Sequence, residues 1–360
     1  IGQQAMFGNT TGSNNTAIGH VALGDNTTAS NNTALGYFAM NANTTGTQNV
    51  ALGSLALDAL TDADNNVALG YLSLSADTLG SRSVAVGSHA LTAQNFTSAT
   101  ETYNTAVGFF AGLAVTTGIQ NTFVGGLAGD GTDDGAYNTA VGYSALSANC
   151  GDQNTCMGYA SAIACTGTKN TTMGSNAGYG LTSGSNNLFL GVDAGRTGSP
   201  GGNITTVSNI LVLGDENITH AYIQVDWTVA SDARDKTDFT ALDLGLDFVK
   251  DLQPVTYKWD KRSKYGDKSA DDYDLNAQTP DGTHKEDWLD IGFKAQEVEA
   301  LEIAAGYDKS SKTNLVSSHT DDGKQMGLQY SKFVPILVKA IQEQNALIEA
   351  LTARIETLEG

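Results

Sequence analysis

The chain has 360 residues, enough for two or three domains of ordinary size, and a formal net charge of −20 at pH 7. Nucleic-acid phosphates need a basic protein face, so this charge argues against a nucleic-acid partner. No apolar run approaches the roughly 18 residues that span a bilayer and no signal peptide can be identified, so we expect no membrane insertion.

A tandem repeat extends from Ile1 to Gly214. Short segments such as NTAIG, NTALG and NVALG recur, and the glycines that end them follow one another at a nearly constant spacing. The regular copies end at Gly19, Gly36, Gly53, Gly70, Gly87, Gly108, Gly125, Gly142, Gly158, Gly174 and Gly191, and less regular copies end at Gly8 and Gly214. Because the sequence begins within a copy, we expect it to be part of a longer protein.

Two positions of each regular copy have a constant character. The residue before the glycine is aliphatic or Met, and the residue three after it is Ala or Ser. Four residues apart on an extended chain, these positions are predicted to share one small apolar face. The glycine permits a bend or a positive φ, and no proline before Pro200 interrupts a β-ladder. We predict a β-solenoid whose coils stack, share a core with other chains, or both.

The remaining chemistry of the repeats favours structural roles. The glycines do not form a GxxxxGK[ST] phosphate loop, and the five histidines form no HxH or HExxH pair, so we expect no cofactor and no metal. The cysteines lack CxxC spacing and are predicted to be buried, reduced thiols: Cys150, Cys156 and Cys165. Four tyrosines directly follow motif glycines: Tyr37, Tyr71, Tyr143 and Tyr159. We expect them to have a structural role, and the alternative is that they stack on the sugars of a receptor.

The chain changes character at VASDARDKTDF, residues 229–239, where charged and helix-favouring sequence begins. Before this junction, AYIQVDW (221–227) alternates as a strand. After it, we predict a helix over 242–252, a strand over 254–260, a polar surface loop over 261–287 and a strand running into a helix over 291–301. The stretch from Ser310 to Lys324 is predicted to be another loop.

The C-terminal segment, 331–360, is predicted to be a coiled coil. Isoleucine recurs at heptad position a and leucine at position d, and the predicted seam contains Leu337, Ile341, Ile348, Leu351, Ile355 and Leu358, with Gln344 at one d position. Ile at a with Leu at d leans towards dimers, so the prediction of a trimer rests on the rest of the chain and on the resemblance described below. The alternative is an amphipathic helix packed on its own domain.

The repeat segment SVAVGSHAL (83–91) resembles the head repeats of trimeric autotransporter adhesins. This resemblance covers the chain up to about Gly191 and implies a left-handed parallel β-roll with three chains around one axis. Similar repeats occur in bacteriophage tail fibres.

The C-terminal part resembles the intramolecular chaperone domain of endosialidase tailspikes, phage tail fibres and neck appendages. The segments that carry the resemblance are SDARDK, LDFVKDLQPVTYKW, IGFKAQEVE and LQYSKFVPILVKAIQEQ, together with the terminal coil. The resemblance implies a domain that trimerises, registers the β-rich shaft and then cuts itself off. It assigns the catalytic pair to Ser231 and Lys236, and the scissile bond to Ala230–Ser231.

A serine–lysine pair suits this chemistry. A serine hydroxyl is a weak nucleophile until a base takes its proton, and lysine is such a base only when neutral, which burial or a nearby cation favours. A separation of five residues suits a short turn that brings the amine back to the hydroxyl. Asp232, Arg234 and Asp235 are predicted to hold the turn or bridge subunits.

We therefore predict a mainly β protein with four segments: a shaft over 1–214, a connecting strand and cleavage junction over 215–230, an α+β chaperone domain over 231–330 and a trimerising coiled coil over 331–360. The predicted function is that of a homotrimeric tail fibre or tailspike of the phage virion, assembled in the host cytoplasm, that attaches to a host-surface glycan or protein. The alternatives are a bacterial surface adhesin with the same chaperone and a polysaccharide-degrading tailspike. The last needs paired carboxylates in a groove, and the repeats carry few acidic residues.

Overall fold

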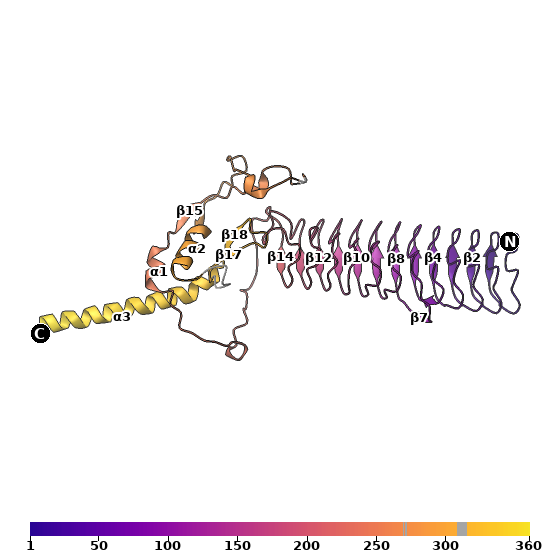
Figure 1. Cartoon of the computed structure of the whole chain (residues 1–360), viewed down its shortest axis with the longest axis horizontal. Coiled ribbons are helices and arrows are strands. Elements are labelled where there is room, and N and C mark those ends of the chain that lie inside the picture. Colours follow the sequence, from indigo (N-terminus) through magenta and orange to yellow (C-terminus); the bar gives the residue numbers. More distant parts are fainter. Residues whose placement is uncertain (269, 271, 308–314) are drawn as a thin grey trace. The chain divides into compact units, whose positions relative to one another are not determined.

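The computed structural model describes residues 1–268, 270, 272–307 and 315–360 of the chain. The chain divides into two compact units, Ile1–Asn217 and Ile218–Gly360. The first unit is a β-solenoid, whose short strands lie one after another along the stack of coils (Figure 1). The predicted fold class is therefore confirmed for the shaft.

The solenoid carries one parallel sheet of twelve strands, each three residues long. They are β1 (Thr16–Ile18), β2 (Thr33–Leu35), β3 (Val50–Leu52), β4 (Val67–Leu69), β6 (Val84–Val86), β8 (Thr105–Val107), β9 (Thr122–Val124), β10 (Thr139–Val141), β11 (Thr155–Met157), β12 (Thr171–Met173), β13 (Leu188–Leu190) and β14 (Leu211–Leu213). Each strand pairs with its equivalent in the next coil, so Ala17 lies opposite Ala34 and Ala34 opposite Ala51. The repeat period therefore sets the register.

The middle residue of each strand faces the core, and this corrects the predicted apolar face. Ala34 is fully buried, whereas Leu35, the residue before the glycine, is 40% exposed. Ala39, three residues after that glycine, is buried again. The two positions that we expected to share a face therefore lie on opposite sides of the wall, because the chain turns a corner at Gly36.

The motif glycines have two physical reasons to be glycine, and the predicted positive φ is confirmed. Gly70 has φ 142°. A Cβ at Gly70 would lie 2.4 Å from the carbonyl oxygen of Gly87 in the next coil. Any other residue would strain the backbone and push neighbouring coils apart.

A row of buried asparagines runs along the inside of the solenoid. The Oδ1 atom of Asn32 accepts the backbone N–H of Asn49 at 2.9 Å, and Asn49 accepts that of Asn66 at 2.9 Å. The Nδ2 atom of Asn49 also donates to the carbonyl oxygen of Ala63 at 2.7 Å. Each asparagine thus satisfies buried backbone groups that would otherwise destabilise the core.

The asparagine row is interrupted at Ser83, next to the longer coil between Gly87 and Gly108. Here the strands β5 (Gly80–Ser81) and β7 (Thr100–Glu101) form an extra parallel pair outside the main sheet. Inside the coil, the amide of Gln94 donates to Oδ2 of Asp77 at 2.5 Å and to Oγ of Ser83 at 2.9 Å. Ser83 thus takes the place of an asparagine in the row, and Gln94 connects it to the buried carboxylate of Asp77.

Burial is the main cause that raises the pKa of Asp77, and the hydrogen bond from Gln94 opposes it. Because the folded-state pKa lies above the ordinary value of 3.8, the stability that Asp77 contributes is complete below that value. It is lost as the pH rises through the raised pKa. We expect Asp77→Asn to reduce the fall in shaft melting temperature as the pH rises above the ordinary value of 3.8. Circular dichroism melts at several pH values test this; Asp25→Asn, at an exposed position, is the control, and an equal fall in Asp77→Asn and wild type would contradict it.

Core volume is conserved between neighbouring positions of a coil. Phe123 is fully buried at a strand centre where most coils have Ala. In the same coil Gly129 stands where the next coil has Leu146, and a Cβ at Gly129 would lie 2.5 Å from the Phe123 ring. Phe189 and Gly195 repeat this exchange, with the corresponding atoms 3.0 Å apart. A large strand centre therefore requires a small partner six residues later.

This exchange predicts strong coupling between two substitutions. Phe123→Ala should cost about 3–5 kcal/mol through its cavity, and Gly129→Leu at least about 1–3 kcal/mol through overpacking. Gly129 has φ 61° and Leu146 has φ 55°, so the backbone accepts leucine. The double variant should recover much of the stability, although Gly112 would still face the vacated ring position. Denaturant unfolding of the four proteins measures the coupling, and simple additivity would contradict it.

The second unit, Ile218–Gly360, is α+β. Its elements are the 3₁₀ turns η1 (Ala233–Asp235), η2 (Arg262–Lys264), η3 (Leu275–Ala277) and η4 (Tyr330–Lys332), the helices α1 (Leu246–Asp251), α2 (Ala295–Ala304) and α3 (Phe333–Glu359), and the strands β15 (Val255–Tyr257), β16 (Asp290–Gly292), β17 (Ser317–His319) and β18 (Met326–Leu328). β15 pairs with β16, and β17 with β18, both antiparallel. The core of this unit contains Leu244, Phe248, Leu252, Val298, Val316, Phe333 and Ile336.

Three predictions for this unit were wrong in part. Residues 221–227 form no strand and are exposed, because no described strand of the chain lies beside them. The helix predicted over 242–252 begins only at Leu246, since Gly245 has φ −136° and ψ −135°. The loop predicted from Ser310 contains β17, and its residues 310–314 lie outside the described part of the chain.

Candidate functional site

The two residues of the predicted dyad are in contact. The Nζ atom of Lys236 lies 2.7 Å from Oγ of Ser231 and 3.4 Å from the carbonyl oxygen of the same serine. The intervening residues form η1, and the backbone N–H of Lys236 closes this turn on the carbonyl of Ala233 at 3.3 Å. A neutral amine in this place can take the hydroxyl proton directly.

The carboxylate of Asp232 holds the start of the turn. Its Oδ1 atom accepts the backbone N–H of Arg234 at 2.9 Å, and its Oδ2 atom pairs with Nη2 of the Arg234 side chain at 2.6 Å. The guanidinium is the main cause that lowers the pKa of Asp232, and the backbone hydrogen bond adds to it. Asp232 is thus the N-cap of η1, and Arg234 and Asp235 lie within it.

The dyad is exposed in the single chain, as are all residues from 217 to 241. Ala230 lies at the end of a stretch, 218–231, that makes no backbone-to-backbone hydrogen bond with any described residue. Tyr222 is 92% and Trp227 65% exposed. The predicted scissile bond and the Ser231–Lys236 pair are thus both accessible to solvent in the single chain.

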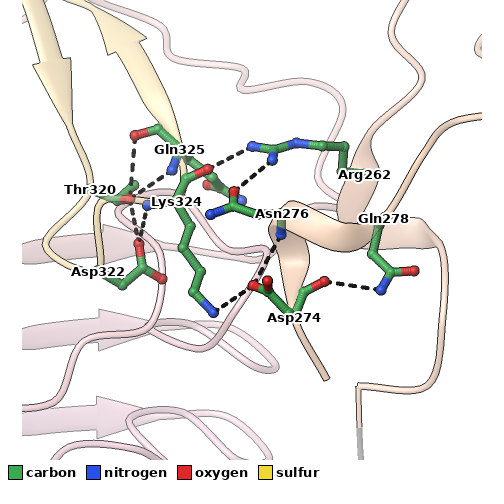
Figure 2. A network of polar contacts seen from close by, with 8 residues as sticks. All are labelled: Arg262, Asp274, Asn276, Gln278, Thr320, Asp322, Lys324 and Gln325. Atoms are coloured by element: carbon green, nitrogen blue, oxygen red, sulfur yellow. Dashed lines mark hydrogen bonds and ion pairs between the residues drawn. The ribbon is translucent and has the colours of Figure 1, made fainter. Parts of the chain in front are cut away.

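The polar segment after β15 is anchored by a network at η3 (Figure 2). Arg262 donates to the carbonyl oxygen of Lys324 at 2.6 Å and to Oδ1 of Asn276 at 2.9 Å. The ammonium of Lys324 pairs with Asp274 at 3.0 Å. Arg262 and Asp274 thus attach this polar segment to the turn between β17 and β18 through Lys324.

A buried carboxylate that we had not predicted fixes α2 to β17. Glu302 is fully buried, and its Oε1 atom accepts the backbone N–H groups of Leu315 at 2.9 Å and Val316 at 2.5 Å. Its Oε2 atom accepts the N–H of Ser317 at 3.1 Å. The sequence does contain a signal for the burial of Glu302. This residue lies four positions after Val298 and therefore on the same, apolar face of the helix.

The helix α3 has two parts. Phe333, Ile336 and Ala340 are buried in the unit, and the carboxylate of Glu343 accepts the N–H of Leu246 at the start of α1 at 2.7 Å. The interpretation of a helix packed on its own domain thus applies to the first turns. The predicted seam is exposed, by 43% at Leu337, 56% at Ile341, 53% at Ile348, 58% at Leu351, 54% at Ile355 and 79% at Leu358.

The other predicted site residues lie in the shaft. All three cysteines are buried free thiols, and burial raises the pKa of Cys150 to about 11. The four tyrosines are exposed, and the rings of Tyr143 and Tyr159 stack with centroids 5.8 Å apart. Within the described residues, no group of three or more His, Cys, Asp or Glu side chains is arranged to hold a metal ion. No described helix is long and apolar enough to cross a membrane.

Comparison with known proteins matches one part of the chain. The family model described as chaperone of endosialidase matches residues 231–307, beginning at the serine of the dyad. No curated protein and no solved structure matches the chain significantly. The match of residues 231–307 to this family model, together with the β-solenoid shaft before it, fits a tail fibre or tailspike that carries a C-terminal chaperone domain.

Proposed function

We propose that the chain belongs to a homotrimeric phage tail fibre whose chaperone domain drives assembly and then releases itself by autoproteolysis at Ala230–Ser231. The observation that carries this proposal is the 2.7 Å contact between Ser231 Oγ and Lys236 Nζ at the first residues of the matched domain. The free fibre attaches the virion to a host-surface receptor, a glycan or a protein.

Two exposed apolar surfaces support the trimer. The first is the seam of α3, which presents six aliphatic side chains to solvent. The second is the outer face of the shaft sheet, where one aliphatic residue or Met precedes each glycine, as Leu35 and Leu52 do. Long exposed apolar surfaces mark protein interfaces. A partner that covers the shaft row must repeat at the same period as the coils, which another copy of this chain does.

The reacting groups of the cleavage all come from this chain and water. Lys236 takes the proton of Ser231 Oγ, which attacks the carbonyl carbon of Ala230. A C–O bond forms, the C–N bond to Ser231 breaks, and the proton passes from the lysine to the released α-amine. Water then hydrolyses the ester, leaving a carboxylate on Ala230 and restoring the serine hydroxyl.

Assembly and cleavage are coupled in this proposal. The dyad is exposed in one chain, so partner chains must cover it before the neutral amine is favoured. A parallel β-structure forms slowly because its contacts are distant in sequence, and a C-terminal helical trimer raises the effective concentration of the chains and sets their register. If cleavage occurs only after partner chains cover the dyad, it releases only correctly assembled shafts.

Mass spectrometry and light scattering of the folded protein test this function. We expect a complex of three times the 37.4 kDa chain mass, containing fragments that end at Ala230 and begin at Ser231. Chain kept in denaturant should stay intact until it refolds. A monomer at micromolar concentration, or fragments with other ends, would contradict the proposal.

A further inference from the structure

We infer that Asp232 is a positioning residue for the self-cleavage, because its carboxylate closes the turn that brings Lys236 to Ser231. The inference rests on the proposed function. It concerns a group that need not touch the reacting atoms, since its contacts are with Arg234.

The turn must bring together two residues that are far apart in an open chain. Five extended residues span up to ~17 Å. In the structure the side-chain atoms of the pair are 2.7 Å apart. The intervening backbone has φ −66° and ψ 131° at Asp232, then enters η1, and the N–H of Lys236 reaches the carbonyl of Ala233. The first step of this path is the N-cap.

Asp232 is that N-cap. It accepts the N–H of Arg234 at 2.9 Å, the geometry by which Asp, Asn and Ser stabilise helix starts. No residue of η1 is buried, so no core packing holds the turn closed. The closed population of such a turn depends on its own hydrogen bonds, and the cap is one of them.

The ion pair with Arg234 has a smaller part. The guanidinium side chain is 88% exposed, and exposed ion pairs stabilise little. Arg234→Ala keeps the backbone N–H that the carboxylate caps. Arg234→Ala therefore removes the ion pair and leaves the N-cap hydrogen bond of Asp232 in place.

A series of substitutions at one position tests the inference. Single-turnover cleavage after refolding should follow the known order of N-cap preference, with Asp232→Asn and Asp232→Ser within about twofold of wild type, Asp232→Gly slightly slower and Asp232→Ala about five- to tenfold slower. Arg234→Ala should stay within about twofold of wild type. The pH dependence of the rate should keep its shape in Asp232→Ala, because a positioning residue moves no proton.

Each other outcome has a clear meaning. Wild-type rates in Asp232→Ala, or an Asn variant as slow as the Ala variant, would overturn the inference. A changed pH profile in Asp232→Asn would overturn it as well, by making Asp232 a participant in proton transfer. Size-exclusion chromatography checks that each variant still assembles, and the Asn and Ser variants keep the test decisive if the Ala variant does not. Cleavage that persists in Ser231→Ala would instead refute the proposed function itself.

Discussion

Ser231→Ala should yield a folded, assembled and uncleaved chain. The substitution removes one exposed oxygen per subunit, so stability should change little, yet the nucleophile is lost. Denaturing electrophoresis after refolding should show only the full-length band. A remaining fragment that ends near Ala230 would mean that another residue or an outside protease cuts the chain.

Lys236→Ala should also prevent observable cleavage, because general-base assistance contributes about 10²–10⁴-fold to such rates. Lys236→Arg should fail as well, since a guanidinium remains protonated at physiological pH. Lys250→Ala is a matched control, because that lysine pairs with Asp247 on an exposed surface of α1. Equal cleavage in Lys236→Arg and wild type would remove the lysine from the mechanism.

Ile348→Asp should prevent assembly of the proposed trimer. The substitution places a carboxylate in the centre of the proposed seam of α3, where each buried, unpaired charge costs several kcal/mol. We expect insoluble or misassembled protein on expression and little cleavage of whatever remains soluble, because the dyad stays uncovered. The measurements are light scattering and electrophoresis of the soluble fraction.

The control for this variant lies on the same helix. Ala353→Asp introduces the same charge five residues later, at heptad position f, which faces away from the seam. It should assemble and be cleaved like wild type. Soluble, cleaved trimer from Ile348→Asp would show that the helix does not nucleate assembly.

The sequence predicts the shaft well because its signal is repeated many times. The period fixed the pairing of Ala17 with Ala34, and the glycines marked the corners. The prediction that Leu35 faces the core was wrong. Side chains alternate between the two faces only within the three-residue strand, and the chain turns at Gly36 immediately afterwards. Local period is a poor guide where the direction of the chain changes every few residues.

The chaperone unit was harder to predict because its elements are short and polar. β17 reads SSH and β18 reads MGL, which carry little strand propensity, so a loop was predicted around His319. The role of Glu302 depends on backbone groups 13–15 residues away, which no local pattern reveals. The Ser231–Lys236 contact was expected from spacing and resemblance, and Asp232 was expected to hold the turn or bridge subunits. Its cap on the N–H of Arg234 could be identified only from atomic positions.

The asparagine row allows the length of the shaft to change in whole coils. Each of its hydrogen bonds, like each strand pairing, joins a coil only to its immediate neighbours, as from Asn32 to Asn49 and from Asn49 to Asn66. Removing or adding one whole coil within the regular part of the row leaves the same backbone and asparagine groups facing each other at the joint. Fibre length can therefore vary in steps of about 4.8 Å, the spacing of paired strands, without any change to the ends that start or release the assembly.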